Sequence, residues 1–479
     1  MQTAHPRRWT ALAVIALAQF VVIMDTSIIG VALPEIQTDL GFRPEDLSWV
    51  FNAYVVAFGG LLLLGGRLSD LLGAKRVFTA GWAILAAGSL AAGLAESTSV
   101  EIAARALQGA GAALIAPSGL TLLIMLFGHG PKELMKAFAV YGAAAPAGGT
   151  AGVFLGGVIT EWVSWPWVFY VNIPIALVAI AVTPGLMPGA AVRKGSLDLT
   201  GAVTATAGLA LTVFGIVRAP EEGWGSLTTI AVIGGGVALL GLFVALQASA
   251  REPLMRLSIL RTPNLAAANL AQLLLGAAWI PMWFFLNLYL QQVLGFGAFE
   301  GGAALLPMTV AIMLLMVVVA PRVINRFGFK TPIVAGMLGL AAGMVLLSLI
   351  RPDGSFVVDV LPASLVAAAG MALAFIPSLG TAISAAKPEE GGLASGIVNT
   401  SYQVGSALGL AAMTAVATSQ GAERLGDVGA LTDGYSAAFL GAAGIALVGA
   451  LLASVLLRVP RARADDALAD TRDGTPIAA

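Results

Sequence analysis

Residues 9–33 read WTALAVIALAQFVVIMDTSIIGVAL, and Asp25 is the only charged side chain in this run. A helix of roughly 20 apolar residues is needed to cross a hydrocarbon core of about 30 Å. Arg7 and Arg8 precede the run, as in a secretion signal, but it is too long for a signal peptide and lacks a clear small-residue cleavage site. We therefore predict that residues 9–33 form a membrane-spanning helix that the mature protein keeps.

The composition of the whole chain agrees with this prediction. Its 479 residues are 58% hydrophobic and only 11% charged, which is too apolar for a soluble protein. Cysteine is absent, so disulfides, thiol nucleophiles and thiolate metal sites are excluded. The net charge of -1 gives no support to a nucleic-acid partner.

Thirteen further apolar runs of similar length predict an all-α polytopic membrane protein with fourteen transmembrane helices. Cytoplasmic loops carry the excess of Lys and Arg, and with both termini in the cytoplasm only four of the 25 basic residues fall in outer loops and one, Arg105, in a span. This orientation predicts a multi-pass protein of the inner (cytoplasmic) membrane. The predicted spans are 9–33, 47–64, 77–95, 100–127, 137–160, 167–183, 199–217, 227–247, 265–290, 303–320, 331–350, 356–386, 393–418 and 435–457.

One short stretch occurs twice and suggests how the chain is divided. RLSDLLGAK at 67–75 corresponds to RVINRFGFK at 322–330, although short basic loops look alike in many membrane proteins. Two homologous helix bundles are a common transporter architecture. We therefore predict two six-helix bundles with two extra helices between them. The expected parts are an N-terminal bundle (1–183), two extra transmembrane helices with cytoplasmic linkers (184–264), a C-terminal bundle (265–457) and a cytoplasmic tail (458–479).

Motifs for catalysis and metal binding are missing from the sequence. It contains no P-loop, HExxH or GxSxG pattern and no Cys/His cluster with metal-ligand spacing. We therefore expect no enzyme activity, no catalytic residue, no metal and no cofactor. Uphill transport would draw its energy from a proton gradient.

Four charged side chains fall inside the predicted spans, where their cost makes them functional candidates. Asp25 lies about 24 Å along a helix that rises from the cytoplasm, and Arg105 lies five residues into a helix that descends from outside, so both are expected in the outer third of the membrane. Such a pair is a candidate for proton coupling, and a fixed structural ion pair is the alternative. Glu101 and Asp359 lie near helix ends, where hydrated interfacial carboxylates are the competing interpretation, and Glu101 is kept as a proton-coupling candidate.

Two spans contain patterns of a different kind. Gly148, Gly152 and Gly156 recur every four residues in the fifth span, which lets two helix backbones approach closely. The ninth span mixes aromatic and amide side chains, as in an amphipathic cavity, although interfacial belts and amide bonds between helices are alternatives. The residues predicted to line a substrate cavity are Gln108, Trp279, Trp283, Phe284, Asn287, Tyr289, Gln291, Asn399 and Gln403.

Four stretches are shared with a known family. They are MDTSIIGVALP at 24–34, GRLSDLLGAKR at 66–76, RALQGAGAA at 105–113 and GLASGIVNTSYQVGSALG at 392–409. On these motifs the chain resembles the major facilitator superfamily, and within it the fourteen-helix drug:proton antiporters, over nearly its whole length.

The resemblance implies an alternating-access exporter in which Asp25 and Arg105 take part in proton coupling. It also implies a gate in which Asp70 docks near the amino-terminal end of the thirteenth helix, where the helix dipole favours a carboxylate. The residues assigned to this gate are Arg67, Asp70, Gly73, Lys75 and Arg76. The chain departs from the family pattern at Gly30, where Asn is common, and at Gly149 and Val153, where prolines are usual.

We therefore predict a proton-coupled multidrug or antibiotic efflux transporter. Its partners would be protons, membrane lipids and a small amphipathic, largely hydrophobic substrate that is neutral or singly charged, and we expect a monomer. A lipid or lipid-conjugate translocator of the same fold is the alternative. A membrane-embedded enzyme or receptor is disfavoured by the missing catalytic motifs.

Overall fold

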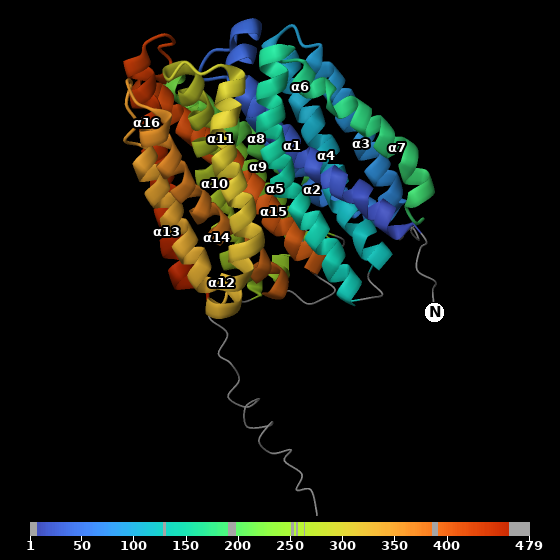
Figure 1. Cartoon of the computed structure of the whole chain (residues 1–479). Coiled ribbons are helices and arrows are strands. Elements are labelled where there is room, and N and C mark those ends of the chain that lie inside the picture. Colours follow the sequence, from blue (N-terminus) through green and yellow to red (C-terminus); the bar gives the residue numbers. More distant parts are fainter. Residues whose placement is uncertain are drawn as a thin grey trace, which may run out of the picture.

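The computed structural model describes residues 7–127, 131–189, 198–250, 253–254, 257–262, 264–385 and 391–458, and this part of the chain contains helices and no β-strand. Long helices lie side by side in a bundle (Figure 1). The α-helices are α1 (Arg8–Leu40), α2 (Trp49–Leu68), α3 (Ala74–Gly93), α4 (Thr98–Phe127), α5 (Pro131–Trp162), α6 (Trp167–Tyr170), α7 (Asn172–Leu186), α8 (Leu199–Glu222), α9 (Leu227–Ser249), α10 (Leu265–Leu288), α11 (Ala298–Leu314), α12 (Ala320–Phe327), α13 (Lys330–Leu347), α14 (Leu361–Ala385), α15 (Gly391–Ala417) and α16 (Val428–Leu456). Shorter helical turns are η1 (Ser69–Gly73), η2 (Leu257–Arg261), η3 (Tyr289–Val293), η4 (Leu315–Val319), η5 (Phe356–Val360) and η7 (Thr418–Ala422).

Within the described residues, 12 helical segments are long and apolar enough to cross a membrane. One of them, Trp49–Gly93, is 45 residues long and contains α2, η1 and α3. Helix α15 is not among the 12. The all-helical, multi-span class is confirmed, whereas the predicted count of fourteen is not.

Several helices extend beyond the apolar runs that predicted them. Helix α1 continues past residue 33 to Leu40 and ends at Gly41, whose φ of 67° and whose N–H bond to the Gln37 carbonyl form a left-handed cap. Helix α16 begins at Val428, earlier than predicted, because the Asp427 side chain caps it by accepting a hydrogen bond from the Ala430 N–H. Capping residues, and not the hydrophobic boundary, set these helix ends.

The two repeated stretches predicted as loops are mostly helical. The first forms the π-helical turn η1 and the second forms α12. Gly73 and Gly328, which correspond in the repeat, both have a positive φ, 90° and 70°. Glycine adopts this conformation readily because it has no Cβ. The shared backbone feature supports the internal repeat.

The helices pack as two groups that contact each other directly, through α5 with α11 and through α2 with α15, and the α8–α9 hairpin lies against both groups. Helices α1–α5 and α7 pack with one another, α10 and α13–α16 do the same, and α8 of the α8–α9 hairpin contacts α2 and α15. The residue boundaries of the predicted domains stay a prediction, and the expected tail beyond residue 458 lies outside the described residues.

The bundle has two distinct ends. Helix α1 begins and α16 finishes at one end, where the side-chain amide of Asn264 donates to the Arg458 carbonyl at 2.8 Å. We call this the termini end. The opposite end carries the connection between α1 and α2, residues 41–48, and is called the far end.

Candidate functional site

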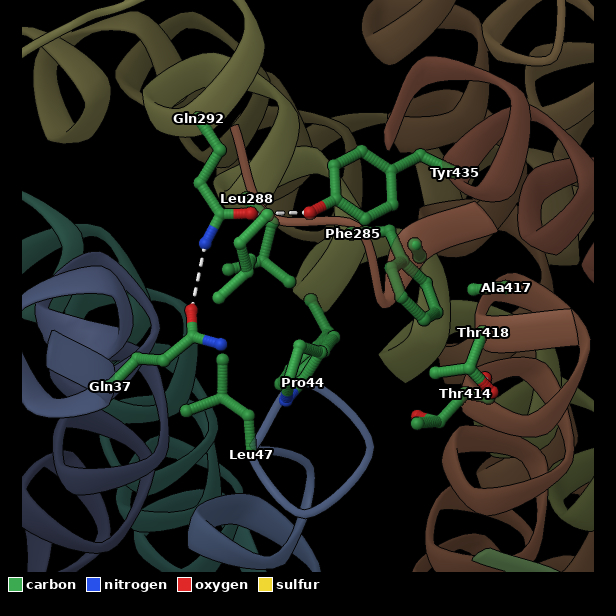
Figure 2. Close-up of a pocket in the computed structure, with 13 residues that line it drawn as sticks. Gln37, Pro44, Leu47, Phe285, Leu288, Gln292, Thr414, Ala417, Thr418 and Tyr435 are labelled. Atoms are coloured by element: carbon green, nitrogen blue, oxygen red, sulfur yellow. Dashed lines mark hydrogen bonds between the residues drawn. The ribbon is translucent and has the colours of Figure 1, made fainter. Parts of the chain in front are cut away.

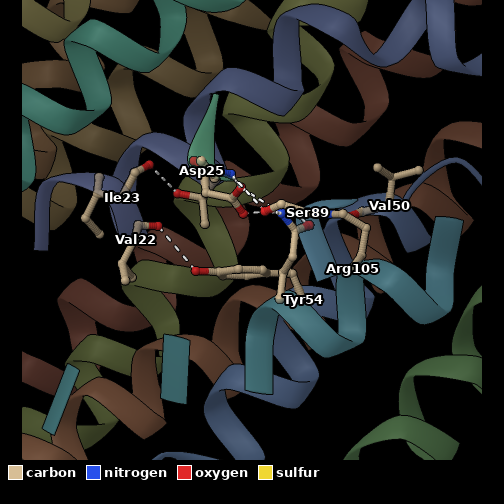
Figure 3. Close-up of polar contacts among 10 residues, drawn as sticks. Val22, Ile23, Asp25, Val50, Tyr54, Ser89 and Arg105 are labelled. Carbon is tan, nitrogen blue, oxygen red and sulfur yellow. Dashed lines mark hydrogen bonds and ion pairs between the residues drawn. The ribbon is translucent and has the colours of Figure 1, made fainter. Parts of the chain in front are cut away.

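An ion pair is buried within the first group of helices (Figure 3). The Arg105 Nη1 of α4 lies 2.7 Å from the Asp25 Oδ2 of α1, and neither side chain is exposed (0% each). The sequence placed these two residues at one depth, and the structure brings them into contact.

Amide side chains complete the surroundings of the Asp25 carboxylate. Its Oδ1 accepts hydrogen bonds from the Nδ2 of Asn172 on α7, at 2.6 Å, and from the Nε2 of Gln108 on α4, at 3.1 Å. The Gln108 Nε2 also donates to the Ser89 Oγ of α3 at 2.8 Å. Charge-assisted hydrogen bonds of this kind are the stronger ones, so α4 and α7 stabilise the carboxylate directly and α3 supports Gln108.

Arg105 has partners besides Asp25. Its Nε donates to the Val50 carbonyl at 2.9 Å, and its Nη1 also donates to the Gln108 Oε1 at 2.7 Å. The Tyr54 ring lies 4.7 Å from the guanidinium carbon. The guanidinium would therefore keep its position if the Asp25 carboxylate were neutralised.

Glu101 lies one helical turn from Arg105 and is fully buried (0% exposed). Neither of its carboxyl oxygens has a hydrogen-bond partner among the described residues. The competing interpretation from the sequence, a hydrated interfacial carboxylate, is therefore wrong for Glu101. It fits Asp359 better, because that carboxylate pairs with the exposed Arg351 at 3.1 Å.

The glycine stripe of α5 faces α1. A Cβ added to Gly148 would collide with the Phe20 carbonyl oxygen, and one added to Gly152 would lie 2.8 Å from the Met24 carbonyl oxygen. One added to Gly156 would lie 2.7 Å from the Ile28 carbonyl oxygen. The stripe is a packing seam along α1, on both sides of Asp25.

The residues predicted to line a substrate cavity have separate contacts in the structure. Gln108 belongs to the Asp25 network. Trp283 is packed between Gly30 and Phe51, since a Cβ on Gly30 would overlap its ring and the Phe51 ring centroid lies 6.3 Å from its own. The Asn287 Nδ2 donates to the Trp283 carbonyl of its own helix, and Asn287 Oδ1 is buried without a partner in the described part of the chain.

The remaining predicted cavity residues are scattered. Trp279 and Phe284 are buried, and Gln403 of α15 lies against Gly59 of α2. The Tyr289 hydroxyl donates to the Arg351 carbonyl at 2.8 Å. Asn399 also interacts with another part of the protein. A cavity role for this set stays a prediction.

Polar contacts join the two groups of helices at the far end (Figure 2). The Gln292 Nε2 donates to the Gln37 Oε1 at 2.9 Å, and its Oε1 accepts from the Tyr435 hydroxyl. The Gln291 Nε2 donates to the Val31 carbonyl at 2.9 Å. The cavity beside these residues is only about 20 Å³, room for about one water molecule. The far end is therefore closed in this structure.

The predicted gate lies at the termini end. Asp70 and Arg76 are exposed, and Asp70 forms no hydrogen bond or ion pair with any described residue. The Lys75 Nζ donates to the Pro184 carbonyl at 2.6 Å, Gly73 ends η1, and Arg67 also has a partner. Residues 386–390, next to the predicted docking point on α15, lie outside the described residues, so the Asp70 contact stays a prediction.

Comparison with known proteins identifies the family to which this chain belongs. The sequence model of the Major Facilitator Superfamily matches residues 15–410. The chain belongs to the major facilitator superfamily. This family is one of transporters, so the chain is a transporter and not an enzyme. The family resemblance predicted from the sequence is confirmed.

Individual members of the superfamily are similar over nearly the whole chain. The cephamycin export protein CmcT of Amycolatopsis lactamdurans is 39% identical over 456 residues, 94% of this chain and 93% of that protein. The puromycin resistance protein pur8 of Streptomyces alboniger is 36% identical over 480 residues, 97% of this chain and 94% of that protein. The crystal structure of the peptide transporter POT in complex with sulfate has a TM-score of 0.67 at 15% identity and covers 93% of each chain, so it shares the fold.

Sequence reasoning missed three members of the Asp25 network: Asn172, Ser89 and Tyr54. Charged groups in a span are strong signals because they are costly there, whereas amides and hydroxyls are weaker ones. Asn172 gave a detectable signal in the sequence, because it is the only amide in the predicted sixth span. The Val50 carbonyl gave no signal in the sequence, because every residue has a backbone carbonyl.

Proposed function

We propose that this chain is a proton-coupled exporter of amphipathic, hydrophobic antibiotics in the cytoplasmic membrane. The observation that carries the proposal is its similarity to antibiotic export and resistance proteins over more than nine tenths of both chains. Further relatives are named for tetracenomycin C export and lincomycin resistance. Such names do not favour the lipid-translocator alternative.

We infer fourteen spans with both termini in the cytoplasm. Helices α2 and α3 have 20 residues each, about 30 Å, so each is long enough to cross once, and the chain can turn at Gly73. Helix α15 has 27 residues, about 40 Å, without a charged side chain. Counting α2 and α3 separately and adding α15 gives the predicted number, and the distribution of Lys and Arg supports the orientation.

In the proposed cycle, Asp25 carries the proton. The outward-open state takes a proton from the outside onto Asp25, which weakens its attraction to Arg105, and substrate leaves. Arg105 stays in place through the Val50 carbonyl, Gln108 and the Tyr54 ring. After return to the inward-open state the proton dissociates into the more alkaline cytoplasm, and the ion pair re-forms. The closed far end and the intact pair fit the part of this cycle in which Asp25 is charged.

The test is efflux from everted membrane vesicles that contain this protein. The probes are puromycin, which has a titratable amine, Nile red, which is neutral, and ethidium, which is a permanent cation. We expect transport that collapses when a protonophore removes the gradient. Transport of a fluorescent phospholipid that persists under the protonophore, with no drug movement, would contradict the proposal and favour a lipid translocator.

A further inference from the structure

A large cavity lies away from the Asp25 network, between the α8–α9 hairpin and both groups of helices. Its volume is about 370 Å³, within the range of small-molecule sites. Its walls come from α2, α8, α9, α10 and α15. This space is therefore large enough to hold a small molecule.

The cavity lies in the half of the bundle nearer the termini end. On α10 its lining begins at Ala266, in the first turn, and reaches Leu273, about 10 Å further along the helix. Half of a hydrocarbon core is about 15 Å thick, so this depth corresponds to one leaflet. Ala266 is exposed, so the lining reaches the surface of the molecule.

The chemistry of the walls defines the ligand. Among the described residues that line the cavity none is charged, and those on α2, α8 and α9 are all apolar or glycine. The polar residues lie together on α10 and α15. Two of them bond to each other, since the Ser401 Oγ donates a hydrogen bond to the Asn269 Oδ1 at 2.9 Å. The third, Thr400, has a buried hydroxyl without a partner in the described part of the chain.

Adjacent glycines on α2 allow this helix to pack closely against α15 and α8. A Cβ on Gly59 would lie 2.8 Å from the Cβ of Gln403 on α15, and one on Gly60 would lie 2.5 Å from the Thr206 hydroxyl of α8. Helix α2 therefore touches both neighbours closely. Helix α9, by contrast, is largely exposed and packs mainly on α8, so the hairpin covers the groove from the membrane side.

We propose that this cavity is a lateral binding site for an uncharged, hydrophobic molecule with one hydrogen-bonding group, which enters from the leaflet at the termini end. The apolar body fills the space under the hairpin, and the polar group bonds to the Thr400 hydroxyl. Both a membrane lipid and an exported compound have this chemistry. The walls belong to both helix groups, so an occupant that fits one conformation better shifts the equilibrium between conformations.

The absence of cysteine allows a direct test, because one introduced thiol is the only one in the protein. Ala205→Cys places it on the α8 wall of the cavity, and Val203→Cys, on the same helix but 63% exposed, is the matched control. Both variants are reconstituted in vesicles and labelled with N-ethylmaleimide, with and without Nile red. With Nile red at about twice its Kd we expect labelling of the Ala205→Cys protein to slow about threefold, because only unoccupied protein reacts. Labelling of the Val203→Cys protein should not change.

A second measurement separates the two sources of the ligand. Native mass spectrometry of the purified protein is compared with that of Ala205→Trp, which fills the cavity, and Val203→Trp, which does not. A phospholipid that is retained by the parent and Val203→Trp but lost from Ala205→Trp identifies a lipid. Nile red protection without a retained lipid identifies an exported compound.

Unchanged labelling of the Ala205→Cys protein, together with equal lipid retention by both Trp variants, would overturn the proposal. Neither readout requires transport. Failure here is therefore distinct from failure of the proposed efflux function.

Discussion

Asp25 combines full burial with three side-chain donors, and this makes it the residue on which proton coupling should depend. Asp25→Asn keeps the size of the side chain but removes its titratable group. We expect it to lower gradient-driven efflux in everted vesicles to the background level while substrate binding is retained. Asp359→Asn, which changes a carboxylate paired with exposed Arg351, is the control and should transport normally. Normal uphill efflux by the Asp25→Asn protein would exclude Asp25 as the essential carrier.

Glu101 is a second buried carboxyl group, and no described residue forms a hydrogen bond with it. Burying an unpaired charge is costly, whereas a neutral carboxyl group is tolerated. We therefore predict that Glu101 exchanges a proton during the cycle. Glu101→Gln should fold and transport, but with fewer protons moved per substrate. The ratio of proton to substrate flux in proteoliposomes measures this, and an unchanged ratio would show that Glu101 is structural.

Gly30 departs from the Asn common in the family, and the structure supplies a reason. The Trp283 ring occupies the space that a side chain at position 30 would need. We expect Gly30→Ala to reduce efflux by displacing this ring, and the added Trp283→Ala to restore part of it. The double-mutant cycle should give a coupling energy of about 0.5–3 kcal/mol. Additive effects of the two substitutions would mean that the contact is unimportant.

At the scale of elements, the seam between α1 and α5 holds the helix that carries Asp25. Gly148 lies directly against the α1 backbone, whereas nothing lies within 4 Å of a Cβ built on Gly142 of the same helix. Gly148→Ala must move one backbone away from the other, and overpacking of this kind typically costs about 1–3 kcal/mol. Gly142→Ala should instead be neutral or gain about 0.5–1 kcal/mol, because alanine is the better helix former.

Thermal unfolding in detergent checks this pair of variants. We expect a lower midpoint for Gly148→Ala and an unchanged or higher one for Gly142→Ala. Equal midpoints would show that the seam tolerates a wider separation of α1 and α5.

For the whole molecule, the main prediction is its topology. Accessibility tags at positions 193, 387 and 470 should face the cytoplasm, and tags at 222 and 428 should face outside, because only this arrangement satisfies the distribution of basic residues. Labelling with an impermeant reagent in intact cells and in everted vesicles measures it. A cytoplasmic tag at 222 would mean that the α8–α9 hairpin does not cross the membrane as proposed.

The sequence by itself determined the all-helical membrane class and predicted Asp25 and Arg105 as a pair, whereas the fourteen spans and the depth of the pair stay predictions. These properties depend on the apolarity of consecutive residues, which determines how a segment partitions into a bilayer, and on the fixed rise of a helix. The repeated stretch also indicated Gly73 and Gly328 as equivalent positions, and both have a positive φ.

Only the tertiary structure decided which side chains meet. Asn172 reaches Asp25 across 147 positions of the chain, Glu101 is buried without a hydrogen bond to any described residue, and Trp283 lies on Gly30. The cavity under the α8–α9 hairpin likewise has walls from five helices. Contacts between helices depend on their relative rotation and spacing, which packing of the whole bundle sets, and no local pattern in the sequence records them.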